Sequence, residues 1–331
     1  MKITFFSAHR YDQDSFERAA DSLPSNTPRE FVYQEAALDT DTIPLAHDSD
    51  AVCVFVNDTL DRQVLEQLHS YGVKAVLLRC AGYNNVDLDT AHQLGMFVAR
   101  VPAYSPPAVA EHALALAMAL NRHIHRAYTR VRDGNFALDG LVGRNLHGKT
   151  VGIIGTGRIG LATARIFKGL GCTVIGSDPF PSEEFNDIGT LVELPQLLKT
   201  SDVISLHCPL LESTHHLINS DTLAQMKKGA LLINTSRGGL IDTHAVIAAL
   251  KIEQLGGLAI DVYENEEPLF FINREETFID DDQFVRLMSF PNVLITGHQG
   301  FFTEEALHEI AHTTLINLED FVAGRECENR V

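Results

Sequence analysis

The sequence lacks any pattern of paired cysteines. The cysteines are Cys53, Cys80, Cys172, Cys208 and Cys327. They are odd in number and scattered, and none belongs to a C-x-x-C pair. This pattern argues against a disulfide framework and against a zinc knuckle, and it is typical of proteins in a reducing compartment. We therefore expect a cytoplasmic protein.

The chain also has few positive charges and no long apolar run. No apolar stretch is long enough to cross a bilayer, and the N-terminal residues MKITFFSAHRYDQD reach charge too early for a secretory signal. Lysine and arginine number 26 against 44 aspartates and glutamates, which gives a net charge of −18. Nucleic acids and anionic membranes would repel such a surface, so we expect neither as a partner. A small anionic substrate stays compatible, because one buried arginine can outweigh a distant field.

Internal repeats, low-complexity tracts and glycine- or serine-rich linkers are missing as well. A chain of 331 residues is nonetheless long for a single core, so we expect two domains. Hydrophobic residues make up 45% and charged residues 21% of the composition, which matches ordinary soluble globular proteins.

Short apolar strands alternate with amphipathic segments in two series. The first series has strand candidates at 2–8, 51–56, 73–79 and 96–101. The second series has them at 149–157, 172–178, 202–207, 230–236, 255–263 and 292–298. Alternation of this kind predicts right-handed crossover units, parallel sheets and therefore an α/β fold.

The other segments follow different patterns. A long apolar helix is predicted after Ser105, a suitable N-cap, with Pro106 at the first helical position. Because this helix is apolar on most sides, we expect it to be buried against its own domain or a second subunit, which favours a homodimer or homotetramer. The acidic segment 265–284 has little periodicity and is expected to form a long loop. After His298 the spacing predicts a closing helix.

The sharpest local motif is Gly155-Thr-Gly157-Arg-Ile-Gly160. It follows a predicted strand and opens a predicted helix, which is the context that a dinucleotide-binding turn requires. Asp178 ends the next strand, where a carboxylate would bind the ribose hydroxyls and repel a 2′-phosphate. No arginine follows in DPFPSEE, so NAD is favoured over NADP. The alternative is a plain glycine turn with a solvated aspartate.

Polar residues end five strands of the second series. In a doubly wound sheet, ligands bind beyond the carboxyl ends of the strands. The residues at these ends are Asp178, His207, Arg237, Asp261 and His298. The second series therefore predicts a convergent polar site.

The residue types at these ends fit a 2-keto acid. Arg237 can bind a carboxylate bidentately and polarise a carbonyl, and a histidine is the natural proton donor near neutral pH. Glu266 could orient His298 through its far ring nitrogen. The residues alone leave open whether Arg237 is a surface ion-pair residue and His298 a core histidine.

A second motif, His308-Glu309-Ile-Ala-His312, matches the H-E-x-x-H pattern of zinc proteases. No G-x-x-H extension follows it, and the helix is typical of a closing helix. We therefore expect no metal site.

Further motifs occur in a fixed order along the chain: RCAGYNNVDLD (79–89), VPAYSPPAVAEHA (101–113), GIIGTGRIG (152–160), SLHCP (205–209), INTSRGGLID (233–242), AIDVYENE (259–266) and ITGHQGFFTEEA (295–306). Together they closely resemble the D-2-hydroxyacid dehydrogenase family, and within it the fermentative D-lactate dehydrogenases. The resemblance covers almost the whole chain. It implies a catalytic trio of Arg237, Glu266 and His298, and it places Asp261 by the nicotinamide. It implies further cofactor contacts from Arg158, Ile159, His207, Cys208, Pro209, Thr214, Thr235 and Ser236.

The resemblance also implies a substrate site and a domain plan. The backbone of Ala81 and Gly82 is expected to hold the substrate carboxylate, with Tyr104 and Phe301 enclosing the side chain. Two Rossmann-like or flavodoxin-like lobes with parallel sheets are expected: a discontinuous substrate domain (1–101 and 300–331) and an NAD-binding domain (102–299). Gly239 and Gly300 stand where relatives often have alanine, which affects pocket shape and not chemistry.

Together these features predict reduction of pyruvate to D-lactate by hydride transfer from NADH. The D configuration follows from the resemblance alone. A relative that acts on a bulkier 2-keto acid or on glyoxylate is the nearest alternative, and a nucleotide-sensing binding protein is the alternative from another class.

Overall fold

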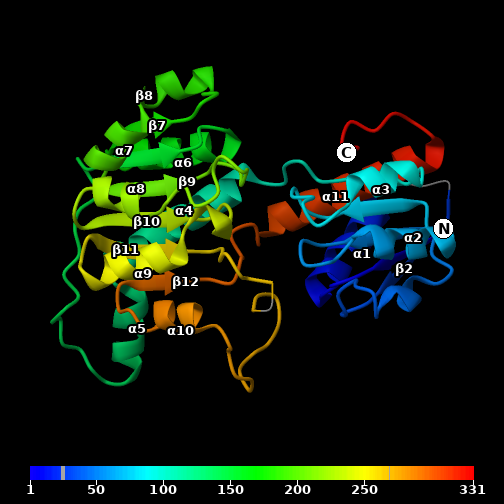
Figure 1. The fold of residues 1–331 in the computed structure, drawn as a ribbon, viewed down its shortest axis with the longest axis horizontal. Coiled ribbons are helices and arrows are strands. Elements are labelled where there is room, and N and C mark those ends of the chain that lie inside the picture. The colour runs from blue at the N-terminus through cyan, green and yellow to red at the C-terminus, as the bar shows by residue number, and fades with distance from the viewer. Residues whose placement is uncertain (24–26, 268) are drawn as a thin grey trace. The chain divides into compact units, whose positions relative to one another are not determined.

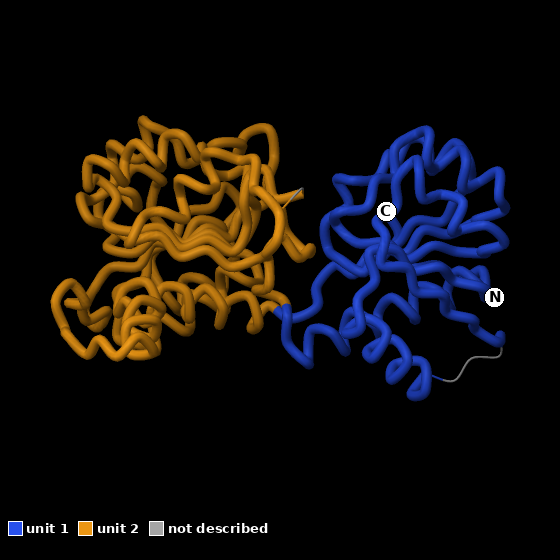
Figure 2. The backbone as a smooth tube through the Cα atoms, turned by 90° about the horizontal axis from the view of Figure 1, so that it is seen from below, with its two compact units in different colours: residues 1–105, 302–331 blue, residues 106–301 orange. Residues whose placement is uncertain are grey.

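The computed structural model describes residues 1–23, 27–267 and 269–331, and the chain divides into two compact units. Unit 1 contains Met1–Ser105 and Phe302–Val331, and unit 2 contains Pro106–Phe301, drawn in blue and orange in Figure 2. The chain therefore passes once into unit 2 and once back, and each unit has its own sheet and core.

Unit 1 is built on a five-stranded parallel sheet with the order β2-β1-β3-β4-β5. The strands are β1 (Lys2–Phe5), β2 (Glu30–Tyr33), β3 (Ala51–Val54), β4 (Ala75–Leu78) and β5 (Phe97–Ala99). The helices include α1 (Arg10–Ser22), α2 (Arg62–Ser70), α3 (Leu88–Gln93), the short η1 (Ile43–Ala46) and α11 (Glu304–Ala323), as Figure 1 shows. Phe5, Phe16, Leu315 and Leu318 share one buried cluster, so the last helix completes the core that the first strand begins.

Unit 2 is built on a parallel sheet with the order β12-β11-β10-β9-β6-β7-β8. The strands are β6 (Thr150–Ile154), β7 (Thr173–Ser177), β8 (Thr190–Leu191), β9 (Val203–Leu206), β10 (Ala230–Asn234), β11 (Leu255–Ile260) and β12 (Val293–Ile295). The helical elements include α4 (Pro106–Asn121), α5 (Ile124–Arg132), α6 (Arg158–Gly169), η2 (Glu183–Asp187), α7 (Leu194–Thr200), α8 (Ser220–Gln225), η3 (Gly238–Leu240), α9 (Thr243–Lys251) and α10 (Asp282–Met288).

Helices cover both faces of the sheet of unit 2 (Figure 1). Val203 packs in a buried cluster with Leu116 of α4 and Phe167 of α6, whereas its neighbour Ile204 packs in a second cluster with Val246 of α9. Successive strand residues point to opposite faces, so strands covered on both sides are apolar throughout. This burial explains why β9 and β10 read as continuous apolar runs.

The structure confirms the expected α/β fold with two parallel sheets. Two strands were missed, because β2 and β8 are edge strands without a fully buried apolar run: β2 is only half-buried and β8 has two residues. The long apolar helix ends at Asn121, because His123 adopts a left-handed conformation (φ 53°) before α5 begins. The expected loop 265–284 ends inside α10, which Asp281 caps by accepting from the Phe284 amide.

Across the described residues, no helix has both the length and the apolar character that a membrane crossing requires.

Candidate active site

The glycine turn after β6 leaves the first turn of α6 open. Gly155 has φ +92°, and a Cβ there would lie 2.5 Å from the Cys208 amide nitrogen. A Cβ on Gly160 would overlap the Gly155 carbonyl oxygen, so helix and turn pack too closely for any side chain. A Cβ on Gly157, the N-cap, would meet nothing within 4 Å. Free amides beside open space are what a pyrophosphate requires, and Arg158 and Ile159 are the first residues of this helix.

Asp178 directly follows β7 and is held by the glycine turn. Its Oδ2 accepts from the Thr156 amide at 2.6 Å and from Thr156 Oγ1 at 3.2 Å, and its Oδ1 accepts from the Phe180 amide at 2.8 Å. The carboxylate is therefore fixed beside the N-terminus of α6, where the ribose of a dinucleotide lies in this fold.

The ends of β9 and β10 carry two buried polar atoms that have no partner within the described residues. These atoms are His207 Nδ1 and Thr235 Oγ1. His207 Nε2 shares a hydrogen bond with Ser205 Oγ at 2.9 Å, and burial lowers the pKa of His207 to about 3, so the ring is neutral. Buried polar atoms normally have partners, so both fit a ligand with hydrogen-bonding groups.

The segments after β9 and β10 are also tied to each other. Ser236 Oγ donates to the Cys208 carbonyl at 2.7 Å, and Thr214 Oγ1 donates to the Pro209 carbonyl at 2.7 Å. Burial raises the pKa of Cys208 to about 11, so this thiol is protonated at neutral pH. The structure thus brings the expected cofactor residues of unit 2 to one edge of the sheet.

Arg237 lies three residues beyond β10, at the same edge. Its Nη1 donates to the Ser236 carbonyl at 2.8 Å, and Asn234 Nδ2 donates to the Arg237 carbonyl at 2.9 Å. A Cβ on the next residue, Gly238, would overlap the backbone of Tyr263, so the ends of β10 and β11 approach closely. The half-buried guanidinium is therefore held on a rigid turn between two central strands.

His298 and Glu266 form a pair beyond β12 and β11. His298 Nδ1 lies 2.8 Å from Glu266 Oε1, and Glu266 Oε2 accepts from the Tyr263 amide at 2.9 Å. Both side chains are largely buried, and the Phe271 ring centroid lies 5.5 Å from that of His298. Because the carboxylate engages Nδ1, the Nε2 atom is the ring nitrogen left for a proton transfer.

Asp261 holds the backbone on which His298 stands. Its Oδ1 accepts from the Gln299 amide at 2.9 Å and from Thr296 Oγ1, and its Oδ2 accepts from the Gly300 amide at 2.7 Å. Burial alone would raise the pKa of Asp261, but hydrogen bonds from His112, Thr296 and Gln299 lower it below its ordinary value. The group is therefore a carboxylate at neutral pH.

The remaining expected substrate residues divide between the two units. Ala81 and Gly82 follow β4 in unit 1, where the Ala81 carbonyl accepts from Arg100 Nη1 at 2.7 Å. Tyr104 precedes α4 in unit 1, whereas Phe301 is the buried last residue of unit 2. Their joint role at one substrate remains a prediction.

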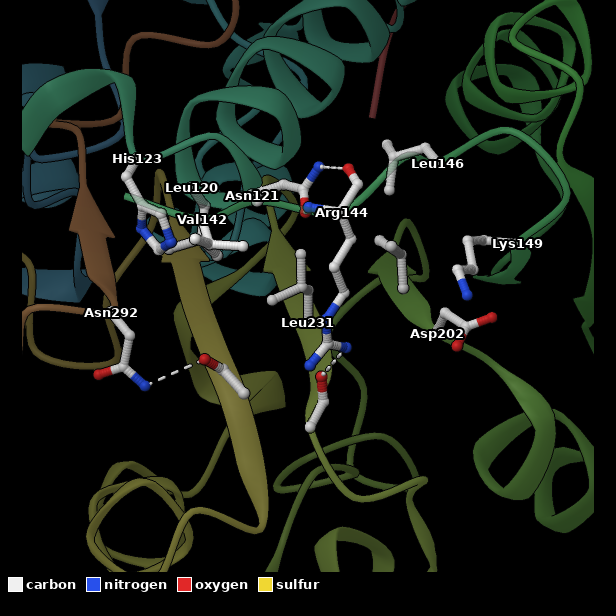
Figure 3. A pocket seen from close by; sticks show the side chains of 14 residues that line it. Leu120, Asn121, His123, Val142, Arg144, Leu146, Lys149, Asp202, Leu231 and Asn292 are labelled. Carbon is white, nitrogen blue, oxygen red and sulfur yellow. Dashed lines mark hydrogen bonds between the residues drawn. The ribbon is translucent and has the colours of Figure 1, made fainter. Parts of the chain in front are cut away.

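A pocket of about 130 Å³ lies at the opposite, amino-terminal edge of the sheet in unit 2 (Figure 3). Lys149, Asp202 and Gly229 line it and directly precede β6, β9 and β10. Arg144 Nη1 donates to the Gly229 carbonyl at 3.2 Å, and Asn121 Nδ2 donates to the Arg144 carbonyl at 2.7 Å. Parallel sheets bind ligands at their carboxyl edge, so these polar groups fasten a loop and do not build the active site.

The H-E-x-x-H motif lies on α11 of unit 1. The His308 and His312 rings stack with centroids 5.9 Å apart, and Glu309 accepts from Thr313 Oγ1 at 3.0 Å. Among the described residues, no three histidine, cysteine, aspartate or glutamate side chains lie where they could hold a metal ion.

His112 and Thr296 both reach Asp261, and neither was predicted from the sequence to belong to the site. His112 Nε2 lies 3.2 Å from Asp261 Oδ1. The available signal was weak: His112 is one of two titratable residues in a mostly apolar helix, next to Glu111, and Thr296 lies two residues before His298.

Comparisons with known proteins identify the family of the chain. Residues 114–300 match the model of the D-isomer specific 2-hydroxyacid dehydrogenase family, NAD binding domain. The chain is 58% identical to 2-hydroxyacid dehydrogenase A of Aspergillus oryzae, over 99% of this chain and 94% of the relative. The apo-structure of D-lactate dehydrogenase from Escherichia coli is similar with a TM-score of 0.92 at 48% identity, with full coverage of both chains.

A further solved structure is described as the pyruvate reductase of Chlamydomonas reinhardtii. It is similar with a TM-score of 0.93 at 44% identity, over 99% of this chain and 98% of that one. These matches confirm the expected family resemblance and NAD as the cofactor.

We expect the charge of Asp178 to set the preference for NAD over NADP. The change Asp178→Asn keeps the size of the side chain and removes the charge that repels a 2′-phosphate. The ratio of NADH to NADPH affinity, measured by fluorescence titration, should then fall roughly ten-fold or more, which corresponds to about 1.4 kcal/mol. Asp221→Asn on α8 is the control for net charge. An unchanged ratio in Asp178→Asn would show that this carboxylate does not read the ribose.

Proposed function

The chain belongs to the D-isomer specific 2-hydroxyacid dehydrogenase family, and from this premise we propose that it is an NAD-dependent D-lactate dehydrogenase that reduces pyruvate to D-lactate. The observation that carries this proposal is the His298–Glu266 pair at 2.8 Å, on the same sheet edge as Arg237 and the open glycine turn. Similar proteins named D-lactate dehydrogenase and pyruvate reductase support the choice of substrate.

Arg237 is assigned the capture of the substrate. A guanidinium can donate two parallel hydrogen bonds to a carboxylate, and its charge draws electron density from the neighbouring C2 carbonyl. The rigid turn between β10 and β11 supports this role, because orientation of the reacting groups lowers the barrier only if the groups are held in place. The backbone of Ala81 and Gly82 is assigned to bind the same substrate carboxylate. Tyr104 and Phe301 are assigned to enclose the methyl group of pyruvate.

His298 is assigned the delivery of the proton. NAD in its reduced form, held at the glycine turn, would supply the hydride that C2 of the substrate accepts, so the carbonyl oxygen would need a proton. His298 Nε2 donates that proton, while Glu266 fixes the ring orientation through Nδ1 and stabilises the positive charge of the protonated ring. In the direction of lactate oxidation, the same nitrogen accepts the proton.

The two units receive different tasks in this proposal. Unit 2 binds NAD through the glycine turn and Asp178, and unit 1 supplies the remaining substrate contacts. The five free, buried cysteines support a reducing, cytoplasmic location.

We also propose that the chain forms a homo-oligomer through α5 and the loop after it, residues 124–142, here called the arm. Large apolar side chains of the arm are exposed: Ile124, Tyr128, Val131, Phe136, Leu138 and Val142. The arm carries three arginines and two aspartates in a chain of net charge −18, so its apolar side chains lie on a nearly neutral surface where a second copy meets little charge repulsion.

The proposed reaction is tested by following NADH consumption with a panel of 2-keto acids and assigning the chirality of the product. We expect pyruvate to be reduced faster than glyoxylate or bulkier keto acids, and the product to be D-lactate. Turnover of larger keto acids alone would keep the mechanism and change the substrate. Tight NADH binding without turnover of any keto acid would make the protein a nucleotide sensor.

The change His298→Ala should lower kcat by roughly 10²- to 10⁴-fold, the usual contribution of a general acid, and leave NADH affinity unchanged. Glu266→Gln retains a hydrogen bond to Nδ1 but removes the charge, so its loss of kcat should be smaller. His308→Ala, at an exposed position on α11, is the control for loss of a histidine. If His298→Ala instead abolished NADH binding, the histidine would be structural.

The arm proposal predicts a change of mass in solution. Light scattering should give a dimer or tetramer for the wild-type chain and a smaller mass for Val131→Glu combined with Leu138→Glu, because charges would be buried at the interface. Ile252→Glu, at an exposed position after α9, should keep the wild-type mass. A monomeric wild-type chain would contradict the proposal.

A further inference from the structure

The Asp261 carboxylate receives a side chain from α4 that lies far away in the sequence. His112 Nε2 lies 3.1 Å from Thr296 Oγ1 and 3.2 Å from Asp261 Oδ1. Thr296 Oγ1 donates its own hydrogen to Asp261 Oδ1, so its oxygen is an acceptor toward His112. An ionised carboxylate is also an acceptor only. His112 Nε2 therefore carries a hydrogen and donates it to both groups.

This cluster lies where the chain crosses between the units. Helix α4 begins at Pro106, the first residue of unit 2, and Gly300 adjoins Phe301, the last residue of unit 2. Asp261 Oδ2 accepts from the Gly300 amide, and Oδ1 is bound by His112. The buried carboxylate of Asp261, at the end of β11, thus contacts both the helix that begins unit 2 and the segment that ends it.

The backbone that this carboxylate holds is under strain. His298 has φ +53°, a left-handed conformation that a histidine rarely adopts. Its amide donates to the Asp261 carbonyl at 2.7 Å, and the two following amides donate to the Asp261 carboxylate. Asp261 alone therefore holds the turn that presents the His298 imidazole to Glu266. The orientation of Asp261 depends in turn on the groups that bind its carboxylate.

We propose that His112 is a positioning residue for proton transfer: with Thr296 it orients the Asp261 carboxylate, which holds the Gln299 and Gly300 amides and so keeps His298 against Glu266. This inference rests on the proposed function for its kinetic readout, but not for its structural one.

Gly300 is the point at which this arrangement is tightest. A Cβ there would lie 3.0 Å from Asp261 Oδ2 and 3.4 Å from His112 Cδ2. The carboxylate would have to move by a few tenths of an ångström to accept a methyl group, whereas the distance to His112 is an ordinary contact. A methyl group at position 300 would therefore act on the orientation of the Asp261 carboxylate.

The test compares two substitutions at one position. His112→Gln retains an N–H donor near the position of Nε2, and His112→Leu has a similar size without a donor. In the protein without cofactor, hydrogen exchange of the Gln299 and Gly300 amides should accelerate roughly ten-fold or more in His112→Leu and change little in His112→Gln. Glu111→Leu, at the exposed neighbouring position on α4, is the matched control and should leave these amides protected.

Kinetics with pyruvate and NADH provide the second readout. His112→Leu should lower kcat by roughly ten- to a hundred-fold with NADH affinity retained, because a small misplacement of a reacting group has effects of this size. His112→Gln should recover most of that loss. Equal loss in both variants would show that packing matters and not the hydrogen bond, and wild-type behaviour of both would also overturn the inference.

Failure of the proposed function and failure of the role of His112 give different results. If the wild-type chain turned over no keto acid, the proposed function would fail, yet the exchange measurement would still decide the role of His112. The change Gly300→Ala should also speed exchange of these amides, and its effect should be smaller in the His112→Leu background, because both act on one carboxylate. Fully additive effects would contradict a shared route through Asp261.

Discussion

The candidate active site depends first on the parallel pairing of the central strands in unit 2. Because β6, β9, β10, β11 and β12 run in one direction, every loop that leaves a carboxyl end lies on the same edge of the sheet. The glycine turn, His207, Arg237, Asp261 and His298 are thereby gathered from a stretch of more than a hundred residues. No single local element could bring these groups together, since the register of the ladder sets their spacing.

The same constraint explains how much the sequence could predict. Buried parallel strands read as apolar runs, and the residues that end these runs are polar, so the edge of the sheet was predictable before any contact was known. The glycine turn was equally clear, because close packing excludes a side chain at Gly155 and Gly160, and Gly157 lies beside open space at the N-terminus of α6. By contrast, the edge strands β2 and β8 carry no such signal, since half-exposed or very short strands need no continuous apolar run.

Contacts that join distant segments could not be derived from spacing. The His298–Glu266 pair spans 32 residues and was one possibility among several acidic residues of the same loop. The approach of His112 to Asp261 was not predicted, because a histidine on an apolar helix is equally compatible with a plain core position. The break between α4 and α5 comes from the left-handed backbone conformation of His123, and no glycine or proline in the sequence marks it.

The energetics of the His298 turn show why so many groups converge on one aspartate. A non-glycine residue held in a left-handed conformation costs of the order of 1–3 kcal/mol, and a hydrogen bond to a charged group contributes about 1.5–3 kcal/mol. The two amide contacts of the Asp261 carboxylate together exceed this strain, whereas one contact alone would about offset it, and both contacts require a fixed carboxylate plane. Burial removes the water that could substitute for a lost partner, so the orientation of Asp261 has to come from side chains such as Thr296 and His112. Under the proposed function, the geometry of the proton donor His298 would thus depend on groups that exchange no proton with the substrate.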